Sequence, residues 1–229
     1  MSSDSSASYG AKQLDALLAR VRACRQCASV AAKGKPLAHV PRPVLQVAPT
    51  ARLLIAGQAP GTRVHASGVP FTDPSGERLR TWLGIDANTF YDEARVAILP
   101  MGFCFPGLDD KGGDRPPRPE CAPLWRGSIL DHLKDLRLIL MVGGYAQRWH
   151  LSLYDATLAR RPLTEIVACW RDVLALSQAP RLMPLPHPSW RNNGWLRRNP
   201  WFEAELLPIL RAEVVNALAT SIRRPPTRL

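Results

Sequence analysis

Four short runs of apolar residues, spaced at intervals of roughly 40 residues, constrain the fold of this chain more than any other feature. Each run is too short for a helix and is continuously apolar rather than alternating, which is typical of strands covered on both faces. The runs are Leu53–Ala56, Val96–Leu99, Leu138–Val142 and Leu182–Leu185. Because the intervals leave room for helical crossovers, the sequence predicts an α/β fold: a three-layer α/β/α sandwich with a central, roughly four-stranded parallel sheet.

Helical periodicity occurs before, between and after these runs. Leu14, Leu17, Leu18 and Val21 predict a first helix that ends near Cys24. The expected crossover helices are 76–83, 122–133 and 163–176, followed by a last amphipathic helix over 202–218. We interpret residues 11–222 as a single domain between two tails, 1–10 and 223–229, which are expected to be flexible because they lack apolar periodicity.

Composition narrows the class of protein. With 229 residues and 46% apolar side chains, the chain can bury a sizeable core, which excludes collagen-like, mucin-like and wholly disordered proteins. Thirty Lys and Arg against 19 Asp and Glu give a net charge of +11, which favours a polyanionic partner such as nucleic acid. No apolar stretch is long enough to span a membrane and the N-terminus does not resemble a signal peptide, so we expect a soluble, cytoplasmic protein without membrane partners.

Unusual residues follow each apolar run. In a parallel sheet, ligands bind outside the carboxyl ends of the strands, so chemistry is expected in these segments. They are Gly57–Gly61, Pro100–Cys104, Gly143–Tyr145 and Pro186–Ser189. The glycines of the first segment allow close approach of a ligand, although a tight turn would also explain them. The segment is not a phosphate-binding P-loop, since the terminal Gly-Lys-Ser/Thr is absent.

Five cysteines are present, and two of them form a Cys24-x-x-Cys27 pair. In a chain without an export signal, this pattern favours a metal site or scattered buried thiols over a disulfide framework. Cys104 and Cys121 lie further along the chain, whereas Cys169 lies in an apolar helical stretch and is interpreted as a small core residue. Four thiolates suit tetrahedral zinc as well as an iron-sulfur cluster, so ligand count alone does not separate the two.

Two motifs carry a family resemblance. Gly57-Gln58-Ala59-Pro60-Gly61 is followed after six residues by Gly68-Val69-Pro70-Phe71 and then Ser75-Gly76, and His187-Pro188-Ser189 follows the last apolar run. This pattern resembles the iron-sulfur-containing branch (families four and five) of the uracil-DNA glycosylase superfamily, over nearly the whole folded region. The spacing of Cys24, Cys27, Cys104 and Cys121 is similar to that branch's four ligands of a [4Fe-4S] cluster.

The resemblance implies a DNA repair enzyme that hydrolyses the N-glycosidic bond of uracil in DNA and leaves an abasic site. It implies that Phe71 stacks on the extruded base, with Gly57 and Ala59 beside it. His187 is expected to donate a hydrogen bond to the departing uracil anion. Gln58 or Asp73 would orient the attacking water, although Asp73 also fits the N-cap of a helix. His65 is the next candidate among the histidines.

This sequence departs from the family at two positions in the expected pocket. Gln58 replaces a glutamate that handles the water, and an amide cannot accept a proton as a base. Pro100 replaces the asparagine that reads uracil, so backbone groups of Gly102 and Phe103 become the expected readers of the base. A non-catalytic binder of abasic or deaminated DNA is therefore the alternative function, and a zinc-stabilised hydrolase of free nucleosides is a third.

A basic and aromatic segment directly follows His187. Its cations are expected to meet DNA phosphates while an aromatic or Leu side chain fills the space left by the flipped base. The residues expected to bind DNA are Ser189, Trp190, Arg191, Arg197 and Arg198. The polar segment 109–118 is expected to wrap the cluster or touch the DNA backbone, and the protein is expected to act as a monomer.

Overall fold

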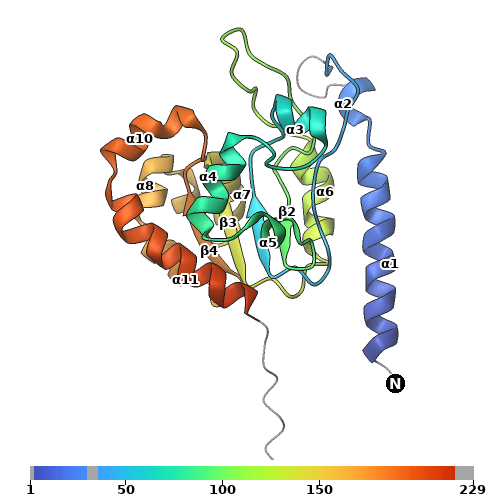
Figure 1. Cartoon of the computed structure of the whole chain (residues 1–229). Helices are drawn as coiled ribbons and strands as arrows, with labels where there is room; N and C mark the ends of the chain where they lie inside the picture. The colour runs from blue at the N-terminus through green and yellow to red at the C-terminus, as the bar shows by residue number, and fades with distance from the viewer. Residues whose placement is uncertain (1–2, 30–35, 220–229) are drawn as a thin grey trace, which may run out of the picture.

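A computed structural model describes residues 3–29 and 36–219 of the chain. Its centre is a parallel sheet with the strand order β2-β1-β3-β4 (Figure 1). The strands are β1 (Leu53–Ala56), β2 (Val96–Ile98), β3 (Leu138–Val142) and β4 (Arg181–Leu185). The predicted α/β fold with a four-stranded parallel sheet is therefore confirmed, and each strand coincides with one of the four apolar runs to within a residue at either end.

The strands are apolar throughout because both faces of the sheet are covered. Leu54 and Ala56 pack into one hydrophobic cluster, whereas Leu53 and Ile55 pack into the other. In the register of the sheet, Leu53 lies opposite both Val96 and Leu138. The carboxyl ends of the strands therefore meet at one edge of the sheet.

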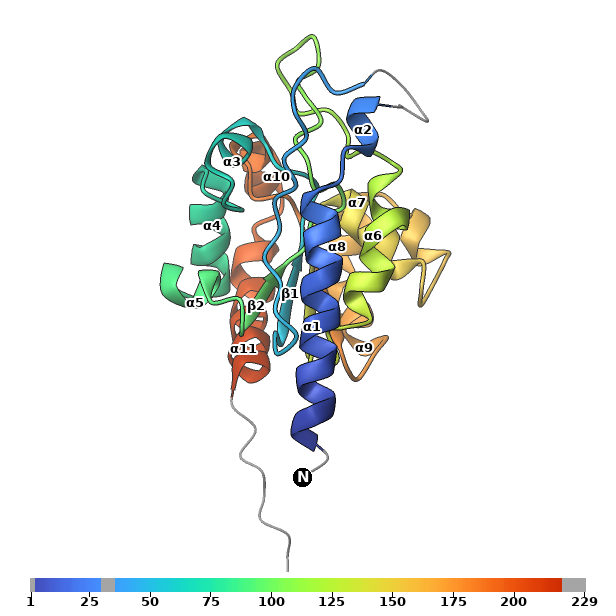
Figure 2. The same ribbon diagram turned by 90° about the vertical axis from the view of Figure 1, so that its right-hand side faces the viewer.

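Helices cover both faces of the sheet (Figure 2). One face carries α1 (Ser3–Arg22), α6 (Cys121–Leu130) and α7 (Gly144–Leu151), and the other carries α4 (Pro74–Leu83), α5 (Ala87–Tyr91) and α11 (Leu207–Leu218). Two short helices, α8 (Leu163–Ala168) and α9 (Trp170–Ala175), precede β4 and contribute to both clusters. The remaining elements are α2 (Gln26–Ser29), α3 (Thr62–Ser67), α10 (Asn193–Arg198), the 3₁₀ turns η1 (Leu158–Arg160) and η2 (Trp190–Asn192), and a π-helical turn η3 (Phe202–Leu206).

Three helices differ from the sequence-based expectation. α1 begins at Ser3 and so extends into segment 1–10, where no regular structure was expected; segment 223–229 lies outside the described residues. The helix expected over 163–176 is divided at Cys169, whose backbone (φ −90°, ψ 30°) is not helical. The last helix starts as the π-helical turn η3, and Pro208 lies in the first turn of α11, where its missing N–H does least harm.

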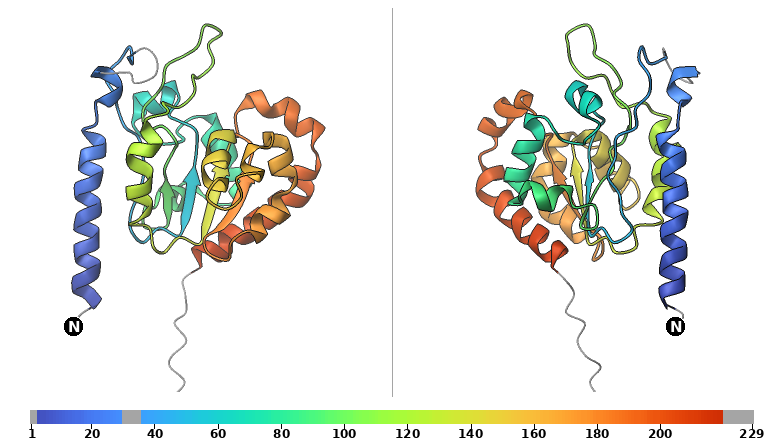
Figure 3. Two further views of the ribbon diagram at one scale, coloured as in Figure 1. Left: turned by 180° about the vertical axis from the view of Figure 1, so that it is seen from behind. Right: turned by 45° about the vertical axis from the view of Figure 1, so that its right-hand side comes forward.

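Figure 3 shows α1 running beside α6 along one side of the molecule. It also shows a long segment, between β2 and α6, that projects above the carboxyl end of the sheet. Within the described residues, no helix combines the length and apolarity needed to cross a membrane.

Candidate active site

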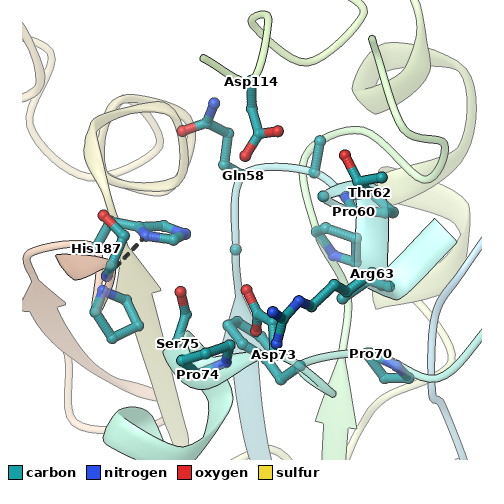
Figure 4. Close-up of a pocket in the computed structure, with 18 of the residues that line it drawn as sticks. Gln58, Pro60, Thr62, Arg63, Pro70, Asp73, Pro74, Ser75, Asp114 and His187 are labelled. Atoms are coloured by element: carbon teal, nitrogen blue, oxygen red, sulfur yellow. Dashed lines mark hydrogen bonds between the residues drawn. The ribbon is translucent and has the colours of Figure 1, made fainter. Parts of the chain in front are cut away.

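A cavity of about 500 Å³ lies at the carboxyl edge of the sheet, where parallel sheets bind their ligands. Its walls come from the loop after β1, the segment that leads into α4, the segment between β2 and α6, and the loop after β4 (Figure 4). The structure brings together here most of the residues singled out in the sequence. These are Gly57, Gln58, Ala59, Phe71, Asp73, His187, Ser189, Trp190 and Arg191.

Other expected site residues lie elsewhere. Gly102 and Phe103 line a second cavity, next to the cysteines, because the amide of Gly102 bonds back to the carbonyl of Gln58 (2.9 Å) and turns the segment away. His65 is not among the residues that line the active-site cavity. Its ring packs against those of His39 and Phe105, with centroid distances of 4.4 and 5.7 Å. Arg197 and Arg198 are exposed on α10 and do not line the cavity either.

Phe71 forms one wall of the cavity and has an unusual backbone. Its φ of 55° lies in the left-handed region, which is strained for a residue with a side chain. The hydroxyl of Tyr91 donates a hydrogen bond to its carbonyl oxygen at 3.1 Å. An ideal Cβ on Gly57 would lie 3.4 Å from Cζ of the Phe71 ring, so the ring packs directly on the glycine backbone. The ring is therefore fixed against the loop after β1.

Asp73 caps α4, as one interpretation of the sequence predicted. Its Oδ1 accepts a hydrogen bond from the amide of Gly76 at 3.2 Å, and Pro74 occupies the first helical turn. The same side chain lines the cavity. Asp73 therefore both caps α4 and contributes its carboxylate to the wall of the cavity.

His187 directly follows β4, after Pro186. The amide of Ser189 donates to Nδ1 at 3.3 Å, and the side chain of Asn192 donates to the His187 carbonyl at 2.6 Å. Because Nδ1 accepts, a neutral imidazole carries its proton on Nε2. Burial lowers the pKa of His187, against the opposing charges of Asp73 and Asp114. The ring is thereby held as a neutral hydrogen-bond donor.

Asp114 lines the same cavity, although no motif or periodic pattern in the sequence singles it out. It belongs to the segment 105–120, which has no apolar periodicity, so neither its path nor its side chain could be placed from the sequence. Its Oδ2 would lie 3.6 Å from an ideal Cβ on Gly61, which puts the carboxylate above the loop after β1. Burial is the largest effect on the pKa of Asp114 and raises it. The negative charges of Asp73 and Asp109 also raise this pKa, whereas the charges of Arg191 and His187 lower it.

Four of the five cysteines gather around the second cavity. They are Cys24, Cys27, Cys104 and Cys121. Burial raises the pKa of both Cys104 and Cys121 to about 12, and the other thiols of the group add to the rise. The amide of Phe103 donates to Sγ of Cys121 at 3.3 Å. Within the described residues, no group of three or more His, Cys, Asp and Glu side chains is arranged to hold a single metal ion.

The donor set of this second cavity fits a thiolate-bound centre. Thiols with such raised pKa values would be deprotonated only beside a strong positive charge, which a bound metal centre supplies. Cys169 lies apart, partly buried against the hydrophobic core, and its thiol donates to the carbonyl of Ile166 at 3.4 Å.

A comparison with family models agrees with the position of the cavity. The model described as "Uracil DNA glycosylase superfamily" matches residues 45–211. The matched region contains all four strands and the segments that line the active-site cavity, together with Cys104 and Cys121, whereas Cys24 and Cys27 precede it. Since the match covers more than half of the 229 residues, the chain belongs to the uracil-DNA glycosylase superfamily.

Proposed function

We propose that this protein removes uracil, or another deaminated base, from DNA by hydrolysis of the N-glycosidic bond. The observation that carries the proposal is the neutral His187 donor, which shares one cavity with the Phe71 ring and two carboxylates. A cavity of about 500 Å³ is within the usual size range of ligand sites, and it opens at the protein surface.

The chemistry follows from these contacts. The target nucleotide leaves the helix, at a cost of a few kcal/mol, and its base stacks on Phe71. As the glycosidic bond breaks, the electron pair moves onto the base, and Nε2–H of His187 donates a hydrogen bond to the base oxygen that gains charge. Gln58 and Asp73 lie in the wall where they could orient the water that attacks the sugar.

The rim of the cavity suits a DNA backbone. Trp190 is 71% exposed beside the cavity, and the Arg191 guanidinium lies over its ring at 5.6 Å from the centroid. A large exposed aromatic side chain can occupy the space that a flipped base leaves, and an adjacent cation can meet a phosphate. By contrast, Trp195 packs on Phe202 and donates its indole N–H to Thr164, so it serves the fold.

We also propose that Cys24, Cys27, Cys104 and Cys121 hold a [4Fe-4S] cluster, which would make the enzyme one of the iron-sulfur type. All four thiols line one cavity, and the same sulfur-only donor set also suits a zinc ion, which is the alternative centre. When bound, the cluster would tie the N-terminal segment to both ends of segment 105–120.

Metal content tests the cofactor proposal. Freshly prepared protein is expected to contain iron and sulfide in equal amounts and to absorb near about 400 nm. Cys24→Ala is expected to lose this absorbance, whereas Cys169→Ala, which removes a thiol that does not line the second cavity, should keep it. Stoichiometric zinc without iron would contradict the proposal.

A panel of oligonucleotides, each with one modified base, tests the enzymatic function. Under single-turnover conditions the protein should produce alkali-sensitive abasic sites on uracil or another deaminated base. Pro100 lines the cavity where the family's base-reading asparagine is expected, and this observation favours a binding protein as the second candidate. Tight binding to modified DNA without any cleavage would support that second candidate and overturn the first.

A further inference from the structure

We propose that Asp114 is a catalytic residue of this site: its carboxylate accepts the proton of the attacking water. The inference rests on the proposed glycosylase function and deepens it. The water oxygen bonds to C1′ of the sugar, the glycosidic electron pair leaves with the base, and one water proton moves to Asp114. The base departs as an anion that takes its proton from solvent, and Asp114 later returns its proton to solvent.

Asp114 lies in a part of segment 105–120 where the two strands of the loop are joined by backbone hydrogen bonds. It forms an isolated antiparallel bridge with Leu108. Beside the bridge, the amide of Arg115 donates to the carbonyl of Gly107 at 2.9 Å, and the amide of Asp109 donates to that of Gly113 at 2.7 Å. These bonds fix the backbone that carries the carboxylate.

A contact with the loop after β4 holds the segment over the cavity. The Arg191 guanidinium, from the loop after β4, donates to the carbonyl of Gly112 at 3.2 Å. The same loop carries His187, so the segment and the hydrogen-bond donor of the reaction are linked through the backbone. Asp114 and His187 thus stand on adjoining walls of one cavity (Figure 4).

The two carboxylates of the cavity differ in their availability. Oδ1 of Asp73 already accepts the amide of Gly76 as a helix cap. Among the hydrogen bonds found between the described residues, none involves the Asp114 carboxylate. Asp114 is therefore free to accept a proton from water, whereas the same step at Asp73 would compete with the start of α4.

Residue 58 is a glutamine, so the loop after β1 carries no side chain that can act as a base. Gln58 follows β1 and lines the cavity, but an amide side chain can only hold and orient a water molecule. Figure 4 shows Gln58 and Asp114 on the same side of the cavity, away from Asp73. Asp114 thus supplies the carboxylate that the loop after β1 lacks, from a different part of the chain.

Burial prepares this carboxylate for the role. It raises the pKa of Asp114 toward neutral pH, where a general base works best, while Arg191 and His187 limit the rise. Asp73 and Asp109 are the negative groups that act in the other direction. The raised pKa makes this carboxylate a stronger base than an exposed aspartate.

Three isosteric variants test the inference: Asp114→Asn, Asp73→Asn and Asp109→Asn. Each removes one negative charge, and Asp109 lies in the same segment, where an Asn can still accept from the amides of Lys111 and Gly113. Asn is also a good N-cap at position 73. The measurements are the single-turnover rate against pH on the best substrate of the oligonucleotide panel, affinity for the same DNA, and thermal unfolding.

The Asp114→Asn rate is expected to fall by about 10²- to 10⁴-fold, as for loss of a general base, with DNA affinity and unfolding unchanged. Its rate should also lose the decline toward acidic pH that is expected of the wild type. Asp109→Asn should stay within about threefold of the wild type, and Asp73→Asn, whose side chain lines the cavity, should lose less rate than Asp114→Asn. An undiminished Asp114→Asn rate, or a large loss at Asp73→Asn alone, would overturn this inference only. A wild type that cleaves no modified base would overturn the proposed function and the role of Asp114 together.

Discussion

The carbonyl oxygen of Phe71 occupies the space that a side chain on Gly76 would need, since an ideal Cβ on Gly76 would lie 1.8 Å from that oxygen. The close approach comes from the left-handed backbone of Phe71 and from the first turn of α4. The Phe71 carbonyl is also the acceptor for the Tyr91 hydroxyl. The ring expected to stack on the base is therefore positioned by a glycine five residues later in the chain.

Gly76→Ala is expected to destabilise the protein by about 1 to 3 kcal/mol, because the backbone of Phe71 or of α4 must shift to admit the methyl group. Urea unfolding measures the change. Gly127→Ala is the matched control: it lies inside α6, and its Cβ would meet no other heavy atom within 4 Å. This control should keep its stability or gain up to about 1 kcal/mol. Equal stabilities of Gly76→Ala and the wild type would contradict the geometry.

A second prediction concerns a buried pair behind the active site. Arg126 is fully buried and donates to the carbonyls of Leu99 and Pro100 and to Nε2 of His150, the last at 2.8 Å. His150 must therefore be neutral. Burial, with the charge of Arg126, lowers its pKa from 6.5 to about 3. As pH falls below 6.5, His150 binds a proton in the unfolded chain but stays neutral in the folded chain. The folded state therefore loses stability as pH falls from 6.5 to about 3.

His150→Gln should weaken this acid sensitivity, because an amide oxygen can accept from Arg126 at any pH. The wild type is expected to lose up to about 1.4 kcal/mol more than the variant for each pH unit in the window. Urea unfolding at several pH values from about 7 to about 4 provides the comparison. Other histidines titrate equally in both proteins, so parallel curves would show that His150 is not the source.

The strands could be predicted from the sequence because burial on both faces leaves a simple pattern of continuous apolar residues. The position of His187 followed in turn, since the residue after a parallel strand faces the ligand edge. The Asp73 cap could also be predicted, because Asp before Pro at a helix start is a local signal. The break at Cys169 could not, since it arises where the chain passes between two clusters.

Asp114 was missed because its position depends on contacts between distant parts of the chain. Its segment reaches the cavity through the bridge to Leu108 and the bond between Arg191 and Gly112, neither of which leaves a periodic pattern. Gly102 was misplaced for a related reason. It follows β2 at the ligand edge, but its bond to the Gln58 carbonyl directs the next residues to the cysteines.

Arg191→Ala is expected to weaken DNA binding and to lower the slope of log K against log salt by about 0.9, the change for one lost phosphate contact. Binding titrations at several salt concentrations measure the slope. Arg171→Ala is the control, because it removes the same charge from α9, which leads into the amino end of β4. Arg171 forms an ion pair with Glu205 at 2.9 Å. This control should retain the wild-type slope. Equal slopes for the two variants would place the DNA elsewhere.

The last prediction concerns the protonation state of His187. His187→Ala should lower the single-turnover rate by about 10²- to 10³-fold, the usual effect of removing one preorganised donor, while DNA affinity is kept. Because Nδ1 accepts from Ser189 and burial lowers the pKa, the donor is a neutral imidazole. The wild-type rate should therefore not rise as pH is lowered from about 8 to about 6. An imidazolium donor would give the opposite dependence, because its population grows as pH falls, and such a rise would disprove the neutral donor.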